Sequence, residues 1–295
     1  MLIGELFALA TAVLWAFTSV IFTNEASKIG TFMLNFIRLT IASILLLITL
    51  FFIDYGNIPS FYQSSMLIIS GIVGLVIGDT FLFKSYTING PRVSGLIFSL
   101  NPAMGAIMAY FIFAESISLY AITGIMLTLS GIALVILSKK DTQTVFKPTK
   151  IGIFYALVAA LGQALGLIFV RFATLDSAIS PLLSSFIRNT SAIIIYLPIL
   201  LLFKKWKNPI RIISENRKSA RNLLIGSIIG PYLGITFSLY AITYTKIGIA
   251  SAIMSATPII LLPLSVIFYK EKLNWRAIVG AVVAVIGVSL LFLFK

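Results

Sequence analysis

Three charged residues, Arg38, Asp79 and Arg188, lie well inside apolar stretches of the sequence. Phe-Ile-Arg occurs twice, in NFIRLTIA (35–42) and SFIRNTSA (185–192), and the acid lies in VIGDTFLF (76–83). A charge at the centre of a membrane helix costs about 2.5–3.5 kcal/mol on insertion scales, and intramembrane acids mark functional sites by default. We therefore expect Asp79 to take up a proton or bind a cation. The alternative is a structural pairing with Lys84, although five residues is a poor spacing for contact along a helix face.

The composition places these charges in a bilayer. The chain of 295 residues is 59% hydrophobic and 11% charged, with a mean hydropathy of +1.07. Soluble domains are about half apolar and about a quarter charged, so the bilayer is the expected solvent. Cysteine and histidine are absent, which excludes disulfides, Cys/His metal sites and His- or Cys-based catalysis. We expect no metal and no cofactor.

The positive net charge of +13 has a membrane explanation. In a soluble protein it would suggest nucleic acid. Here the basic residues lie mainly in short gaps between apolar runs, which favours anionic lipid headgroups and no nucleic acid. The opening MLIGELFALATAVLWAF lacks a basic leader region and a clear cleavage site, so it predicts a first span rather than a removed signal peptide.

Ten apolar runs are each close to the roughly 20 residues needed to cross a bilayer as a helix. They cover residues 3–22, 31–53, 66–87, 91–113, 117–138, 150–172, 178–203, 221–243, 247–268 and 274–294. The basic segment 204–221 contains clustered isoleucines and is expected to lie along the membrane surface. The fold class expected is therefore an all-α integral membrane protein with ten transmembrane helices.

The two halves of the chain are copies of each other. IGELFALATA (3–12) resembles IGIFYALVAA (151–160) at an offset of 148, and the arginine motifs match at 150. An offset of 156 then pairs Gly74 with Gly230, Gly78 with Gly234 and Pro102 with Pro258, and it continues through Gly131 and Gly287. We expect a first five-helix repeat at 1–138, a basic linker at 139–149 and a second repeat at 150–295.

An odd number of spans per repeat means that the second copy enters the membrane from the opposite side. Such inverted repeats commonly bind a substrate near the midplane, between the repeats. The gaps after odd-numbered spans hold 17 Lys/Arg, and the other side holds three, Arg171, Lys246 and Lys295. Because cytoplasmic loops carry the Lys/Arg excess, we expect both termini outside, the basic loops cytoplasmic and a multi-pass protein of the plasma membrane.

The doubled motifs resemble those of the EamA-type permeases of the drug/metabolite transporter superfamily. Each third span carries Gly-x₃-Gly (GLVIG, GPYLG), each fourth span a proline 13 residues before a glutamate, and each fifth span Gly-x₆-Gly (GIMLTLSG, GAVVAVIG). The resemblance covers essentially the whole chain. It implies a secondary transporter, often an exporter of amino acids, nucleosides or other metabolites. It also implies a central cavity lined by spans 1, 3, 4, 6, 8 and 9, with spans 2, 5, 7 and 10 peripheral. Many relatives place their termini inside, whereas the charge bias of this chain indicates the reverse.

Six residues are predicted to line the cavity. Trp15 and Gln163 are repeat mates at mid-span depth, where an indole supplies an aromatic wall and an amide supplies a donor and an acceptor. Ordinary helix packing is the alternative for both. The six are Trp15, Asp79, Asn101, Gln163, Tyr232 and Tyr240.

A second group is assigned to structure or gating. Pro102 and Pro258 predict a kink in spans 4 and 9 that acts as a hinge or serves packing alone, and leaves the carbonyls of Phe98 and Met254 without helix partners. Lys84 is expected to reach the interface as an anchor, with ligand contact as the alternative. Inverted topology places Arg38 and Arg188 on opposite sides of the membrane, so we expect structural pinning of each, by snorkelling or by helix-end carbonyls, rather than substrate contact.

The remaining features follow from helix physics. The spaced glycines, such as Gly74–Gly78 and Gly162–Gly166, are expected to serve close helix contact. Glu115 and Glu271 are expected to cap the following helices.

The function expected from these patterns is a permease that moves a small metabolite, such as an amino acid or nucleoside, by alternating access. We expect it to be an exporter coupled to a proton or ion. We expect it to act as a monomer or homodimer. The alternative is a membrane-embedded enzyme acting on a lipid or prenyl substrate. The nine Asp/Glu are scattered, which argues against that enzyme. A channel, with rings of like residues around a pore, is a third class that the mismatched repeat positions do not favour.

Overall fold

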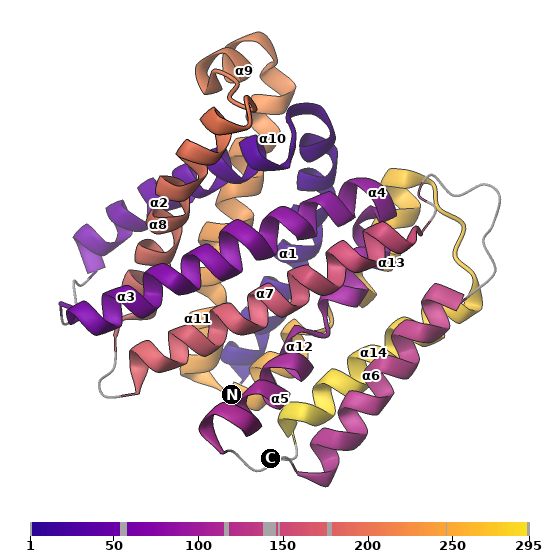
Figure 1. Ribbon diagram of the computed structural model, residues 1–295. Helices are drawn as coiled ribbons and strands as arrows, with labels where there is room; N and C mark the ends of the chain where they lie inside the picture. The colour runs from indigo at the N-terminus through magenta and orange to yellow at the C-terminus, as the bar shows by residue number, and fades with distance from the viewer. Residues whose placement is uncertain are drawn as a thin grey trace.

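A computed structural model describes residues 2–53, 58–114, 118–137, 146, 148–175, 179–245 and 247–293 as helices and short connections (Figure 1). The first repeat contains α1 (Leu2–Ile29), α2 (Thr31–Ile53), α3 (Phe61–Ser70), the π-helix η1 (Gly71–Gly78), α4 (Asp79–Phe98), α5 (Asn101–Phe113) and α6 (Leu119–Leu137). The second contains α7 (Lys150–Thr174), α8 (Pro181–Leu202), α9 (Pro209–Glu215), α10 (Arg217–Ser227), the π-helix η2 (Ile228–Gly234), α11 (Ile235–Tyr244), α12 (Ile247–Met254), α13 (Thr257–Tyr269) and α14 (Trp275–Leu293). Most of the linker predicted at 139–149 lies outside the described residues.

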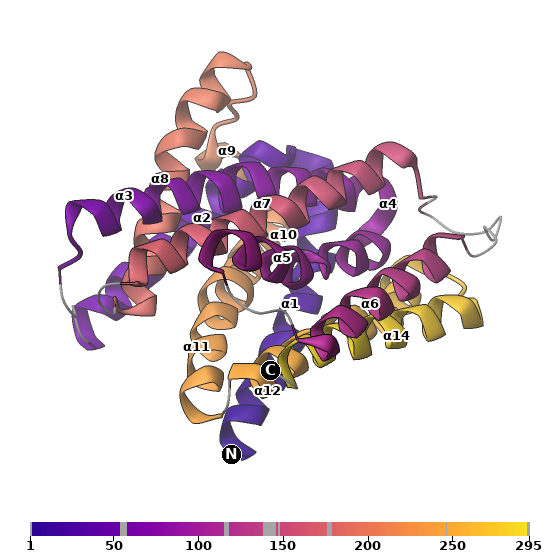
Figure 2. The same ribbon diagram turned by 60° about the horizontal axis from the view of Figure 1, so that its bottom comes forward.

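The prediction of an all-α membrane protein with ten spans is confirmed. Six helical rods in the described residues are long and apolar enough to cross a bilayer, including Phe61–Phe98, which joins α3, η1 and α4. The other spans consist of shorter pieces, such as α12 followed by α13. Both termini lie at one end of the molecule, and α9 projects from the opposite end (Figures 1 and 2).

Three backbone breaks shape the spans. Gly90 has φ +75° and ψ 162°, a region open essentially to glycine alone, and it separates the third span from the fourth within α4. Pro102 and Pro258 lie in the first turns of α5 and α13. The kinks expected at these prolines are therefore full interruptions, where one helix ends and another begins. The carbonyl of Met254 was expected to lack a helix partner. In the structure it accepts a hydrogen bond from the side chain of Thr257, through Oγ1 at 2.8 Å.

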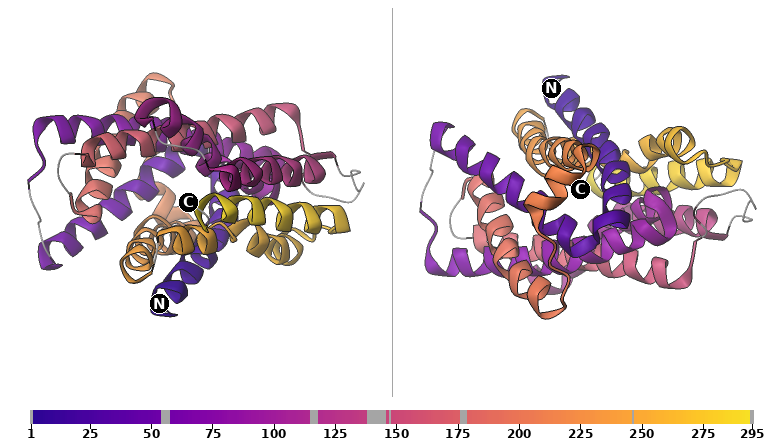
Figure 3. Two further views of the ribbon diagram at one scale, coloured as in Figure 1. Left: turned by 90° about the horizontal axis from the view of Figure 1, so that it is seen from below. Right: turned by 90° about the horizontal axis from the view of Figure 1, so that it is seen from above.

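Contacts between α6 and α14 show the inverted symmetry directly. Gly124 and Gly131 are the repeat mates of Gly280 and Gly287. In the structure Gly131 contacts Gly280, and Gly124 contacts Gly287. The contacts therefore cross between mates, so α6 and α14 run antiparallel about a pseudo-two-fold axis, as a self-complementary interface requires. Figures 1 and 3 show the two helices side by side at one edge of the molecule.

The first helix of each repeat packs mainly against the other repeat. α1 packs on α10, η2, α11, α12 and α13, whereas α7 packs on α3, η1, α4 and α5. α2 joins the first group through α10 and η2, and α8 joins the second through α3 and η1. We call these groups the α1 bundle and the α7 bundle. α14 joins the α1 bundle through α12 and α13, and α6 joins the α7 bundle through α4. The interfaces between the bundles include α2 against α8, α1 and α13 against α4, and α6 against α14.

The spaced glycines serve close helix contact, as predicted. A β-carbon on Gly162 would lie 3.1 Å from the Cα of Gly78, and one on Gly166 would lie 3.1 Å from the Cα of Gly74. Small residues at this spacing let helix backbones approach closely. The same positions in the second repeat, Gly230 and Gly234, meet Thr18 and Trp15 of α1.

Candidate functional site

Asp79 lies at the exit of the π-helix η1, and its backbone N–H donates to the carbonyl of Gly74 five residues earlier. π-Helices are rare and frequently mark functional sites. The Asp79 side chain is buried and forms an ion pair with Arg38 Nη2. Arg38 Nε also donates to Asn35 Oδ1 at 2.7 Å, and its guanidinium lies 4.8 Å from the ring centroid of Phe83. Asp79 is therefore a paired charge in the core of the membrane domain.

The structural pairing considered for Asp79 involved the wrong residue. Its partner is Arg38 of α2 and not Lys84. Lys84 instead lies over aromatic rings of three helices, 5.4 Å from Phe32, 5.3 Å from Phe81 and 5.7 Å from Tyr155. An ammonium held against ring faces is stabilised by cation–π attraction.

The expectation that Arg38 and Arg188 snorkel to opposite surfaces is wrong. Arg38 is only 7% exposed and pairs with Asp79. The Arg188 Nε is buried, and the charge of Arg188 is attracted to Asp79 as well. Because α2 and α8 pack on each other at the interface of the two bundles, both side chains turn toward the interior. Spans 2 and 7 thus contribute charges to the core.

Gln163 of α7 lies beside Arg188. A β-carbon on Gly74 would be 2.9 Å from Gln163 Oε1 and 3.3 Å from Arg188 Nη2. Within the described part of the chain, the buried Gln163 Oε1 and the buried Arg188 Nε have no hydrogen-bond partner. Buried polar atoms normally have partners, so such an exception requires an explanation.

Two tyrosines surround the cluster. Tyr196 donates to the carbonyls of Leu75 and Val76, at 2.9 and 3.1 Å, and its hydroxyl lies 2.8 Å from Thr80 Oγ1. The wide turns of η1 make these carbonyls accessible to a side chain. Tyr86 approaches Ser19 of α1, with 3.2 Å between the hydroxyl oxygens. The Ser19–Tyr86 contact crosses between the bundles, whereas Tyr196 holds α8 on η1.

The other predicted cavity residues do not join one cluster. The Trp15 indole packs on Gly234 of η2, whereas its repeat mate Gln163 meets Gly78 with its backbone and Gly74 with its side chain. Tyr232 shares a hydrogen bond of 2.8 Å with Thr49 of α2. Tyr240 is 41% exposed and stacks on Phe7 near the start of α1, and Asn101 begins α5. Substrate contact by these residues remains a prediction.

The end of the molecule that carries the basic segment is tied by polar contacts. Arg92 Nε donates to Glu271 Oε2 at 2.6 Å, which joins α4 of the α7 bundle to the connection after α13 of the α1 bundle. Within the α1 bundle, Glu25 Oε1 accepts from Lys28 at 2.7 Å and from Asn222 at 2.8 Å. The cap expected for Glu271 is wrong, because Asn274 Oδ1 accepts from the Arg276 N–H in the first turn of α14 at 3.3 Å, while the Glu271 carboxylate binds Arg92. Glu115 lies outside the described residues.

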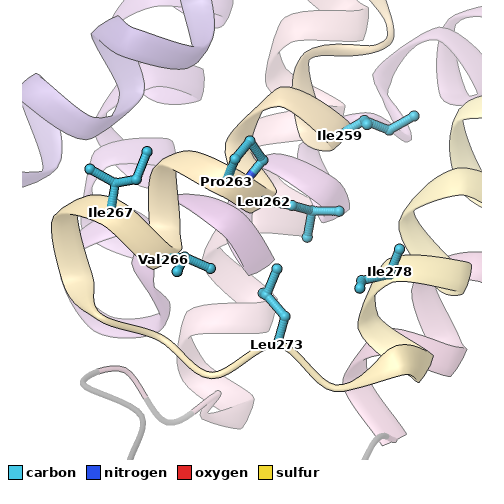
Figure 4. A pocket seen from close by; sticks show the side chains of 7 residues that line it. All are labelled: Ile259, Leu262, Pro263, Val266, Ile267, Leu273 and Ile278. Atoms are coloured by element: carbon cyan, nitrogen blue, oxygen red, sulfur yellow. The ribbon is translucent and has the colours of Figure 1, made fainter.

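A surface groove differs from the buried charged cluster because its lining is apolar. It has a volume of about 470 Å³ and lies between α13 and α14 (Figure 4). Its lining is apolar: Ile259, Leu262, Pro263, Val266, Ile267, Leu273 and Ile278. Sites for metabolites need a few placed polar groups to fix orientation, so the groove does not compete with the buried cluster as a site.

Comparison with known proteins agrees with the doubled architecture. The model of the EamA-like transporter family matches residues 2–137 and again 150–293. The chain belongs to the EamA-like transporter family. This is a transporter family, which removes the membrane-embedded enzyme from consideration. The two matches coincide with α1–α6 and α7–α14.

Two similar proteins match this EamA protein over nearly its whole length. An uncharacterized transporter of Archaeoglobus fulgidus is 25% identical over 292 residues, which cover 98% of this chain and 97% of the relative. A crystal structure of another protein superposes with a TM-score of 0.65 at 18% identity and covers 97% of this chain and 95% of that one. The second likeness shows the fold alone. Together with the family match, these comparisons show a multi-pass membrane transporter.

Proposed function

We propose that this EamA protein exports a small polar metabolite by alternating access, and that the α1 bundle rocks against the α7 bundle. The observation that carries the proposal is the distribution of polar contacts between the bundles. Arg38–Asp79, Ser19–Tyr86 and Arg92–Glu271 each join one bundle to the other. Most other side-chain hydrogen bonds between helices, such as Thr49–Tyr232 and Thr80–Tyr196, lie within a bundle; Thr128 Oγ1, which reaches the Ala284 carbonyl at 3.4 Å, is an exception. A few breakable ties between two internally bonded bodies suit a rigid-body transition.

Asp79 is the proton site in this proposal. It lies on the α7 bundle, whereas its partner Arg38 lies on the α1 bundle. Proton uptake by the carboxylate removes the attraction across the interface and lets the bundles separate. Arg188, on the same bundle as Asp79, then remains as the neighbouring cation that favours proton release. The charges that face Asp79 are thus Arg38 from α2 and Arg188 from α8.

Counterflow in proteoliposomes tests the transport proposal. We expect saturable uptake of a labelled metabolite when the vesicles contain the same unlabelled compound, and competition by excess unlabelled compound outside. A screen of amino acids, nucleosides and sugar phosphates by thermal stabilisation of the purified protein selects the compounds. Flux that does not saturate would indicate a channel, and a complete lack of counterflow would reject the carrier.

The proposed orientation places the end with the basic segment in the cytoplasm and both termini outside. The termini and α9 lie at opposite ends of the molecule (Figure 2), and the Lys/Arg excess supports a cytoplasmic location for the α9 end. Because the chain has no cysteine, single introduced cysteines report orientation cleanly. We expect an impermeant thiol reagent to label Leu2→Cys in intact cells and to leave a cysteine within 139–147 unlabelled. The reverse pattern would invert the orientation.

A further inference from the structure

The buried cluster contains an unused donor and an unused acceptor close together. Arg188 Nε and Gln163 Oε1 are buried without partners in the described part of the chain. They come from α8 and α7, both in the α7 bundle. Gln163 Oε1 and the Nη2 of the same Arg188 guanidinium flank one glycine, Gly74. Ser191, one turn further along α8, donates to the carbonyl of Arg188 at 2.8 Å, and Gly71 of η1 packs on the same carbonyl. The backbone that presents the guanidinium is therefore held against η1.

The charges of the cluster do not balance. Arg38 and Arg188 carry two positive charges and Asp79 carries one negative charge. Arg38 neutralises the Asp79 carboxylate, since it forms the ion pair with it, and Arg38 also donates to Asn35. Arg188 is left with long-range attraction to Asp79 and an unbonded Nε. An uncompensated buried charge is unfavourable, and an anion bound beside it removes the imbalance.

We infer that Arg188 binds the carboxylate of the transported metabolite. The Nε edge of a guanidinium matches the planar geometry of a carboxylate, which accepts two parallel hydrogen bonds from it. A monoanion neutralises the single excess charge of the cluster. Gln163 Oε1 accepts from a hydroxyl or ammonium group of the same metabolite. The inference rests on the proposed transport function and names the substrate class as amino acids or other organic acids, and not nucleosides.

Glycine at position 74 is what keeps this site open. A β-carbon there would lie within 3.3 Å of both polar heads, whereas one on Gly78 would lie 3.4 Å from its nearest neighbour, an ordinary contact. Both glycines pack against α7. Gly74→Ala therefore crowds the site without removing a charge, and Gly78→Ala is the matched control for helix crowding.

Matched pairs of ligands and variants test the inference. The purified protein is screened by thermal stabilisation with the twenty amino acids, their amides, L-lactate, succinate, uridine and inorganic phosphate. We expect one or more carboxylates to stabilise the protein while the corresponding amide and uridine do not. Lactate separates organic acids from amino acids, since it retains the carboxylate without the ammonium group.

Variants of the site test the same inference. Loss of hydrogen bonds to a charged group weakens binding by about 10- to 150-fold. We expect this loss of affinity in Arg188→Gln and a smaller loss in Gly74→Ala. Arg171→Gln, whose guanidinium lies over Phe113, and Gly78→Ala should bind normally.

The outcomes separate the inference from the function on which it rests. Counterflow of uridine or of an amide, without any carboxylate, would support transport and overturn the inference. Equal affinity in the parent protein, Arg188→Gln and Gly74→Ala would also overturn it, as would binding of phosphate alone. If Arg188→Gln does not fold, Gly74→Ala measured against Gly78→Ala decides. Absence of counterflow for every compound would instead reject the proposed function.

Discussion

Asp79→Asn is expected to abolish the dependence of transport on the proton gradient. The asparagine keeps the shape of the side chain and still accepts a hydrogen bond from Arg38, but it cannot take up a proton. Net transport driven by a pH difference across proteoliposomes should fall to the level of protein-free vesicles. Counterflow, which needs no net proton movement, should persist at a reduced rate. The measurement is the initial rate of both assays over a range of external pH.

The control for this experiment is an acid outside the core. Glu215 lies on α9, is 61% exposed and pairs with Arg211 on the surface, so Glu215→Gln should retain the pH dependence of the parent protein. Asp79→Glu should retain part of it, because it restores a carboxyl near Arg38 and Arg188. A pH dependence in Asp79→Asn equal to that of the parent would remove Asp79 from proton coupling and leave it a structural ion pair.

Glu271→Gln is expected to open the end of the molecule that carries the basic segment. The carboxylate of Glu271 is 2% exposed and bonds Arg92 of the other bundle. Removing one partner leaves the partly buried Arg92 without its counter-charge, and the cost of about 3–5 kcal/mol known for fully buried pairs is an upper bound here. The state closed at this end loses that stabilisation. We expect a lower midpoint of thermal unfolding and faster modification of Val20→Cys, a position 2% exposed in the structure.

The double variant Arg92→Gln/Glu271→Gln separates two effects on stability: the loss of the Arg92–Glu271 interaction and the cost of leaving the Arg92 charge unpaired. With both charges removed, the midpoint should recover toward that of the parent, and the two single effects should not add. Thiol modification of Val20→Cys should stay faster than in the parent, because two amides bind each other more weakly than an ion pair. Unchanged modification in both variants would show that Arg92–Glu271 does not hold this end closed.

The sequence by itself determined the fold class and the duplication. Composition and the lengths of the apolar runs decide that the chain crosses a bilayer, because lipid accepts only internally hydrogen-bonded backbone. The copied glycines and prolines reveal two repeats, and an odd number of spans implies their inversion. Gly74–Gly78 and Gly162–Gly166 were predictable as helix contacts, since close approach of backbones requires small side chains.

The sequence alone predicts the counter-ions of Asp79 only in part. Intramembrane charges tend to pair with one another, and the chain offers Arg38 and Arg188 for a lone acid. The depth of each arginine in its own span instead predicts that its side chain reaches the nearest membrane surface. Sequence does not state which spans face each other, and the contact of α2 with α8 is what turns both side chains inward.

Tertiary structure alone decided how the repeats combine. The copied motifs predict two five-helix units, but α1 and α7 pack mainly in the bundle of the other repeat. As a result, Arg38–Asp79, which lies within the first repeat, and Arg92–Glu271, which joins the two repeats, both connect the α1 bundle to the α7 bundle. The physical reason is that local sequence fixes the faces of a helix, whereas the choice among several apolar neighbours depends on close packing over the whole molecule.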